Sequence, residues 1–75
     1  MNVVCKKLKG LMAEHGITIR ELSKMMGISQ KSLSRKINGQ RDWCFDDLIF
    51  IARCFGFAEV KEVFPELYDY VLKVG

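Results

Sequence analysis

The sequence lacks most of the features that mark membrane, secreted or linker-rich proteins. It contains one proline, Pro65, and no low-complexity stretch, and no apolar run reaches the roughly 18 residues that a membrane span requires. The segment from Met1 to Lys7 lacks the basic-then-apolar order of a signal peptide. These absences predict a cytoplasmic protein with no membrane segment.

Cysteine and histidine are too sparse and too scattered for a metal or catalytic site. The three cysteines, Cys5, Cys44 and Cys54, form none of the close C-x-x-C pairs that metal sites use. The single histidine, His15, stands alone beside Gly16, and no acid and base groups pair at a recognisable spacing. We therefore expect reduced structural cysteines, no metal, no cofactor and no enzymatic activity.

Acidic residues are scarce in the first half of the chain. Residues 1–41 hold nine Lys or Arg against two acids, a charge of +7, whereas residues 42–75 carry −4, which together give the net charge of +3. A chain of 75 residues forms one small domain, which buries only about 60% of its unfolded surface. A basic half on so small a fold indicates a polyanionic partner, and the alternative is chance clustering on a solvated surface.

Apolar residues recur at helical spacing almost throughout. The first helix carries one apolar stripe, is capped by Asn2 and ends at Gly16; the stripe consists of Val4, Leu8, Leu11 and Met12. Thr18 and Glu21 match a capping box that opens a second helix ending at Gly27. Its apolar face consists of Leu22, Met25 and Met26.

Three further helices follow the glycine at position 27. Ser29 is a suitable N-cap for a third helix over residues 30–38, which Gly39 closes. A fourth helix is expected from about Asp46 to Gly56, and a short fifth helix contains Val60, Val63 and Phe64. The fold class is therefore all-α, a compact bundle of about five short helices over residues 1–65. Residues 66–75 form a tail for packing or dimerisation, either a short helix after the proline or a strand.

Two short helices joined by a tight glycine-containing turn, over about residues 18–38, have the geometry of a DNA-reading helix-turn-helix. At about 100° per residue, Leu33 and Ile37 point inward and Lys31 and Arg35 point nearly opposite. Lys and Arg donate to the acceptors of guanine in the major groove, and Gln pairs with adenine. Ser34 and Asn38 flank the two cations, and Gln30 starts the helix but lies closer to its core side.

These stretches resemble the Cro and lambda-repressor-like (Xre-type) helix-turn-helix domains of phages and bacteria. Residues 16–29 are similar to the second helix and turn of that family, and residues 29–39 to its recognition helix with the closing glycine. The resemblance covers about residues 4–64 and depends on the joint spacing of Leu22, Gly27, Ile28, Leu33, Gly39, Ala52 and Gly56.

The resemblance implies a five-helix regulator, a phage or bacterial repressor, that binds a palindromic double-stranded DNA operator as a homodimer. The residues expected to contact bases are Gln30, Lys31, Ser34 and Arg35. Those expected to contact the DNA backbone are Thr18, Arg20, Lys36, Asn38, Gln40 and Arg41, with the amide of Trp43 as a further candidate. Backbone contacts position a protein without reading sequence.

Three positions depart from the family pattern. Ile19 stands where a phosphate-binding Gln is common, although Arg20 is a possible substitute. Ser23 replaces a usual small alanine and needs a hydrogen bond if it is buried. Lys36 occupies a place that is often apolar, so Ile37 takes the packing role and Lys36 is expected to add a cation near DNA.

The fourth helix is apolar on nearly every side. Its core face consists of Leu48, Ile51, Ala52 and Phe55, and Ile49, Phe50 and Cys54 extend the apolar surface beyond it. A helix of this kind is buried on more than one side. Either the tail covers it, through Leu67, Tyr68, Tyr70 and Val71, or a second subunit does. The fourth helix and the acidic second half of the chain together support a rival function, a protein-interaction module on the same fold that binds a toxin, a polymerase or a phage factor.

Overall fold

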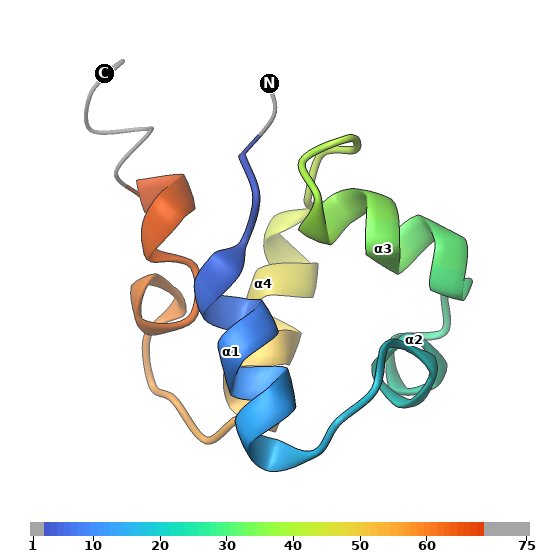
Figure 1. Cartoon of the computed structure of the whole chain (residues 1–75). Coiled ribbons are helices and arrows are strands. Elements are labelled where there is room, and N and C mark those ends of the chain that lie inside the picture. The colour runs from blue at the N-terminus through green and yellow to red at the C-terminus, as the bar shows by residue number, and fades with distance from the viewer. Residues whose placement is uncertain (1–2, 69–75) are drawn as a thin grey trace.

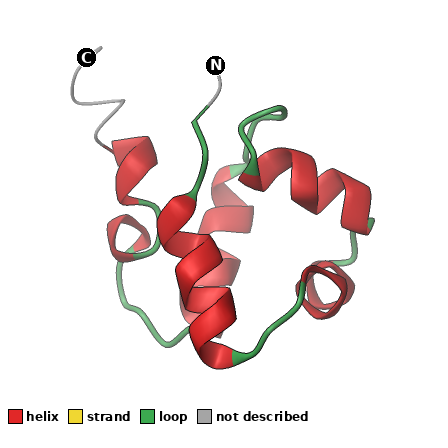
Figure 2. Cartoon of the chain, viewed as in Figure 1, coloured by secondary structure: helices red, strands yellow, loops and turns green. Residues whose placement is uncertain are grey.

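The computed structural model describes residues 3–68, and this part of the chain contains helices and no strand. Figures 1 and 2 show the arrangement. The elements are α1 (Lys6–His15), α2 (Ile19–Met26), α3 (Gln30–Ile37), α4 (Phe45–Cys54) and the 3₁₀ helix η1 (Val60–Glu62). One further helical turn spans residues 65–68. The prediction of an all-α chain of about five short helices is confirmed.

Local sequence signals set both ends of α2. The Thr18 hydroxyl accepts a hydrogen bond from the Glu21 amide at 3.1 Å, and the Glu21 carboxylate accepts one from the Thr18 amide at 3.0 Å. This reciprocal capping box satisfies two amides that the first turn leaves without partners. At the other end, Gly27 takes a left-handed φ of 73°, and the Ile28 amide donates to the Ser23 carbonyl at 3.0 Å. The chain thereby leaves α2 and turns directly into α3.

The start of α1 differs from the sequence-based expectation. The helix begins at Lys6 with Cys5 as its N-cap, rather than near Val4, and Asn2 lies outside the described residues. The Cys5 amide donates to the Ile37 carbonyl at 2.9 Å, so the segment before α1 is tied to the end of α3. This contact connects residues more than thirty positions apart. Helical periodicity in the sequence cannot predict a contact over such a separation.

One hydrophobic core joins the helices. The described residues that form it are Cys5, Leu8, Leu11, Met12, Leu22, Leu33, Ile37, Ile51, Ala52, Phe55, Val63 and Phe64. The Trp43 ring packs edge-on against Phe64 with the ring centroids 5.2 Å apart, a favourable aromatic geometry. The loop between α3 and α4 is therefore anchored to the segment after η1.

Two apolar expectations change in the structure. Met25, expected on the inner face of α2, has 52% of its surface exposed because it lies at the flank of the buried stripe. Val63 and Phe64 are core residues as expected, but the helix beside them is the short 3₁₀ helix η1. None of the helices described here has the length and apolar content needed to cross a membrane.

Candidate nucleic-acid interface

Helices α2 and α3 form a steeply inclined pair. In Figure 1, α2 is seen nearly end-on while α3 runs across the view, and the turn at residues 27–29 connects them. Leu22 of α2 and Leu33 of α3 both have no exposed surface and belong to the same core cluster. This packing holds α3 at a fixed angle to α2. Because it buries only one side of α3, the other side remains exposed and free to contact a ligand.

Helix α3 begins with a defined cap and has two distinct faces. The Ser29 hydroxyl accepts a hydrogen bond from the Ser32 amide at 3.0 Å, which confirms the expected N-cap. Leu33 and Ile37 are buried on one face, and Lys31 and Arg35 are exposed on the other, one helical turn apart. The expected division of α3 into a packing side and a cationic side is confirmed.

The other residues expected to contact bases also lie on this helix. Gln30 is exposed at the N-terminal end of α3, and Ser34 is half-buried one turn further on. The Asn38 amide nitrogen donates to the Ser34 hydroxyl at 3.4 Å, so these two polar side chains form a pair at the end of the helix. The structure brings these side chains together with Lys31 and Arg35 on one short helix.

The expected backbone contacts fall into two groups. Arg20, Gln40 and Arg41 are exposed, Arg20 on the first turn of α2 and the other two on the loop after α3. The Thr18 hydroxyl is engaged in the capping box, because it accepts from the Glu21 amide and donates to the Glu21 carboxylate at 3.0 Å. The hydrogen bonds from Thr18, the backbone one first, lower the pKa of the Glu21 carboxyl.

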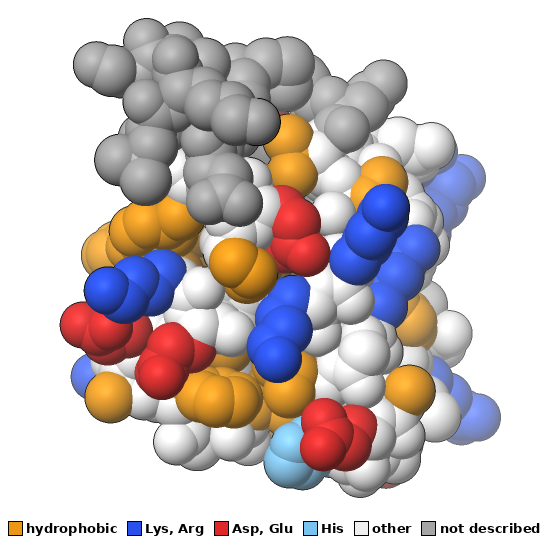
Figure 3. All heavy atoms as spheres, turned by 60° about the vertical axis from the view of Figure 1, so that its left-hand side comes forward, with side chains coloured by type: hydrophobic (Ala, Val, Ile, Leu, Met, Phe, Trp, Pro, Cys, Tyr) orange, Lys and Arg blue, Asp and Glu red, His pale blue; other side chains and the backbone are white. Residues whose placement is uncertain are grey.

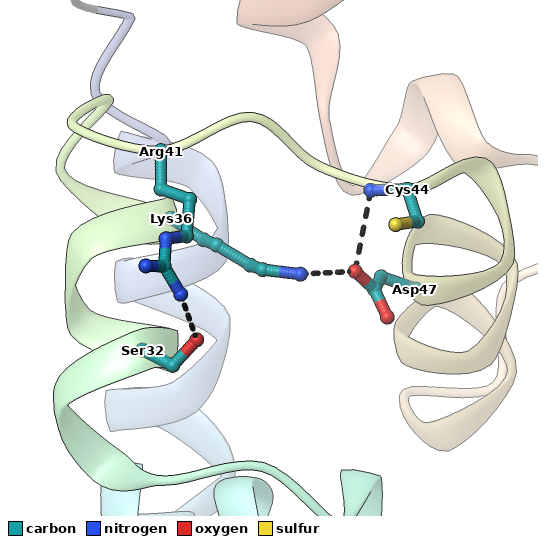
Figure 4. A network of polar contacts seen from close by, with 5 residues as sticks. All are labelled: Ser32, Lys36, Arg41, Cys44 and Asp47. Carbon is teal, nitrogen blue, oxygen red and sulfur yellow. Dashed lines mark hydrogen bonds and ion pairs between the residues drawn. The ribbon is translucent and has the colours of Figure 1, made fainter.

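Lys36 does not lie on the exposed side of α3. Only 8% of its surface is exposed, and its ammonium group forms an ion pair with Asp47 of α4 at 2.5 Å. Figure 4 shows the lysine side chain crossing from α3 to α4. A buried lysine needs a partner for its charge, and the acidic residue that supplies it comes from a different helix. The structure thus argues against the expected phosphate contact of Lys36.

Two residues that matter here, Ser32 of α3 and Asp47 of α4, were not singled out from the sequence. Ser32 accepts a hydrogen bond from the Arg41 guanidinium at 3.1 Å, and Figure 4 shows the arginine reaching back over α3. No pattern in the sequence marks Ser32, which resembles any other polar helix residue. Asp47 had a usable signal, since a lysine in a usually apolar position requires an acid nearby.

The remaining polar candidates have structural roles. Ser23 is buried and donates to the Arg20 carbonyl at 3.0 Å, which satisfies the hydrogen bond that its burial demands. Trp43 is half-buried in aromatic packing, and His15 lies edge-on against Phe55 with centroids 5.2 Å apart.

Burial raises the pKa of the Cys5 thiol, which lies in the core. Cys44 is exposed and stands at the N-cap of α4.

The face of the molecule seen in Figure 3 carries side chains of mixed kinds. Figure 3 shows Lys, Arg, Asp and Glu side chains beside hydrophobic ones on the face that is turned forward from the left of Figure 1. Within residues 3–68, no group of His, Cys, Asp and Glu is placed to hold a metal ion.

Comparison with known proteins gives one result. The family model for the Cro/C1-type HTH DNA-binding domain matches residues 7–58, more than half of the chain, and includes both α2 and α3. No match was found among curated proteins or among solved structures. The matched segment contains the exposed cations of α3, the glycine turn and α4. The chain therefore belongs to the Cro/C1-type helix-turn-helix DNA-binding domain family.

Proposed function

We propose that this protein is a sequence-specific transcriptional repressor, of phage or bacterial type, that reads a palindromic operator with α3. The observation that carries the proposal is the exposure of Lys31 and Arg35, one turn apart, on a helix whose other face is buried. Cationic side chains of this length reach the N7 and O6 acceptors of guanine in the major groove. The family is a DNA-binding one, which fits this assignment.

The proposed base contacts are made by Gln30, Lys31, Ser34 and Arg35. Arg20, Asn38, Gln40 and Arg41 neutralise or bond phosphates around them. Thr18 contributes through its position at the start of α2, because its hydroxyl is engaged with Glu21. Phosphate contacts fix the register of the protein on the duplex, and base contacts supply the sequence preference.

A homodimer is the form proposed to bind the operator. Phe45, Ile49, Phe50 and Cys54, here named the α4 face, leave apolar surface on the outside of α4. Phe45 is 65% and Phe50 39% exposed. The groove beside them is lined by the apolar and aromatic residues Phe45, Ile49, Phe57 and Tyr68 and by the charged residues Arg53, Glu59 and Lys61. A second copy of the chain related by a two-fold axis buries such a self-complementary surface and presents two α3 helices to one palindrome.

The tail enters this proposal only in part. Leu67 packs against the core and Tyr68 lines the groove of the α4 face. The two other residues expected to cover α4, Tyr70 and Val71, lie outside the described residues. We place the helix-turn-helix domain at residues 1–65 and assign residues 66–75 to packing or dimerisation, as the sequence predicts.

Selection of bound sites from a random duplex pool tests the function directly. The expected product is a palindrome whose half-sites lie about one helical turn apart. Its affinity should fall steeply between about 50 and 200 mM salt, because each neutralised phosphate releases counterions. A reporter placed behind the selected site should be repressed. A pool that shows no enrichment, with equal binding to selected and random duplexes, would reject the proposal.

The rival function is a protein-interaction module, which the exposed α4 face favours. In that case the chain binds another protein through Phe45 and Phe50, and DNA affinity is weak and independent of sequence. The same selection separates the two functions. If the protein is a DNA-reading repressor, substitutions on α3 change DNA binding. If it is a protein-interaction module, substitutions on the α4 face change partner binding.

A further inference from the structure

The buried ion pair between Lys36 and Asp47 joins the recognition helix to α4. Lys36 lies on α3, adjacent in sequence to the exposed Arg35, and Asp47 lies in the first turn of α4. Their side chains are 10% and 21% exposed, so the pair is largely shielded from solvent. The Lys36 ammonium also lies 5.9 Å from the centre of the Trp43 ring, a cation–π distance.

A single carboxylate oxygen serves two elements. Asp47 Oδ2 accepts from Lys36 Nζ, and it also accepts from the Cys44 amide at 3.2 Å, at the start of α4. Figure 4 shows both interactions converging on that oxygen. Any movement of α3 along or about its axis that displaces Lys36 therefore breaks a bond to the group that caps α4.

The pair also lies on the flank of α3 that faces the loop. Ser32 and Lys36 are one helical turn apart, and Ser32 holds Arg41 of that loop while Lys36 holds Asp47 beyond it. The segment from Asn38 to Cys44, which contains Arg41 and leads to Asp47, has no regular helix. Two directional interactions therefore restrain this loop: the Arg41–Ser32 hydrogen bond within it and the Lys36–Asp47 ion pair just after it.

Stability alone does not account for a charged pair at this position. Taking two charges out of water costs several kcal/mol per ion, and well-packed apolar pairs of similar volume are often equally or more stable. Packing of Leu33 and Ile37 holds α3 on the core, but hydrophobic contact is non-directional. The ion pair adds a directional restraint on rotation of α3 about its axis, and such a rotation would swing Lys31 and Arg35 away from their targets.

We propose that Lys36 and Asp47 are positioning residues that fix the rotation of α3 and the path of the following loop for DNA binding. This inference rests on the proposed function, in which α3 reads the operator. It assigns to Lys36 an indirect role in place of a phosphate contact. It assigns to the acidic residue Asp47 a role that favours DNA binding, because Asp47 positions α3 even though its own charge repels phosphates.

The sign of the Asp47→Asn effect tests the proposal. If only charge mattered, removal of an acid would raise affinity for DNA. Positioning predicts a loss of about tenfold in affinity for the duplex that the wild-type protein selects from a random pool, equivalent to about 1.4 kcal/mol. The matched control is Asp46→Asn, which removes the same charge from an exposed residue one position away and should keep or slightly raise affinity.

Lys36 variants separate positioning from direct contact. Lys36→Met should lose about as much affinity as Asp47→Asn, and the double variant should lose no more than either, because both changes break one interaction. Lys36→Arg keeps the ion pair and should retain most of the affinity. The slope of log affinity against log salt should stay unchanged in Lys36→Met, since no phosphate contact is removed.

Circular dichroism at the temperature of the binding assay checks that each variant is folded. If Asp47→Asn fails to fold, the double variant Lys36→Met/Asp47→Leu replaces the pair by apolar side chains and is expected to fold and to lose affinity by the same factor. Unchanged or higher affinity in a folded Asp47→Asn protein overturns the positioning role. A wild-type protein that does not prefer its selected duplex overturns the proposed function instead.

Discussion

The Arg41 guanidinium donates a hydrogen bond of 3.1 Å to the Ser32 hydroxyl, so a residue of the loop after α3 is held against α3 itself. Ser32 lies ten positions after Leu22 in the sequence, and Arg41 lies nineteen positions after it. The contact brings a third cation next to the exposed pair Lys31 and Arg35. The basic surface proposed to meet DNA therefore draws on α3 and on its following loop together.

Removal of Arg41 should weaken binding almost uniformly across DNA sequences. Arg41→Ala is expected to lower the salt slope by about one, because one phosphate contact is lost. Ser32→Ala should cause a smaller loss, and the double variant should be no weaker than Arg41→Ala alone, because Ser32 acts through the arginine. Titrations of labelled duplex at several salt concentrations measure both effects. Additive losses would mean that Ser32 contacts DNA independently.

Removal of Lys31 or Arg35 should change sequence preference as well as affinity. Each alanine variant is expected to lose about 1–3 kcal/mol of binding free energy and to relax preference at one position of the half-site. Both side chains are exposed, so thermal stability should be unchanged. Lys6→Ala is the matched control, because Lys6 is exposed on α1, outside α2, α3 and the α4 face. Undiminished affinity in both variants would remove α3 as the reading element.

The capping box of α2 predicts a loss of stability at low pH. Hydrogen bonds from Thr18 lower the pKa of Glu21 below its ordinary value of 4.5, so the ionised carboxylate stabilises the folded state above that value. The stabilisation is lost as the pH falls through the lowered pKa. Chemical unfolding at a series of pH values should show this loss in the wild type and a weaker one in Glu21→Gln. Equal pH profiles for the two proteins would contradict it.

The three thiols should react in an order set by burial. Cys44 is exposed and should be alkylated first, and Cys54, whose pKa is raised by burial, should follow. Cys5 has no exposed surface and a pKa that burial raises, so it should react only when the protein unfolds. Mass mapping after brief treatment with iodoacetamide measures the order. Rapid labelling of Cys5 in the folded protein would show that α1 opens readily.

A charge on the α4 face should disrupt self-association. Phe50→Glu places a carboxylate on the proposed apolar interface and is expected to shift the protein from dimer to monomer in sedimentation experiments, with a parallel loss of affinity for a palindrome. Met25→Glu is the control, because Met25 is also an exposed apolar residue but lies on α2. A wild-type protein that sediments as a monomer at all concentrations would exclude the dimer.

The limits of α2 and α3 follow from the sequence alone because the interactions that set them are local. Thr18 and Glu21 are three residues apart, as are Ser29 and Ser32, and each pair caps its helix through hydrogen bonds within one turn. The periodicity of Leu33 and Ile37 fixes the buried side of α3 in the same way and leaves Lys31 and Arg35 outside. Local hydrogen bonds and a 3.6-residue period are properties of a short stretch of chain, so the sequence contains them.

Other features depended on the way the helices pack. The direction of the Lys36 side chain is set by Asp47, eleven residues away on another helix, and the start of α1 by a bond from Cys5 to Ile37. Helical periodicity gives the face on which a residue lies but not its neighbour from a distant segment. Only the tertiary fold brings such groups within hydrogen-bonding distance, because the path of the intervening loop decides which ones meet.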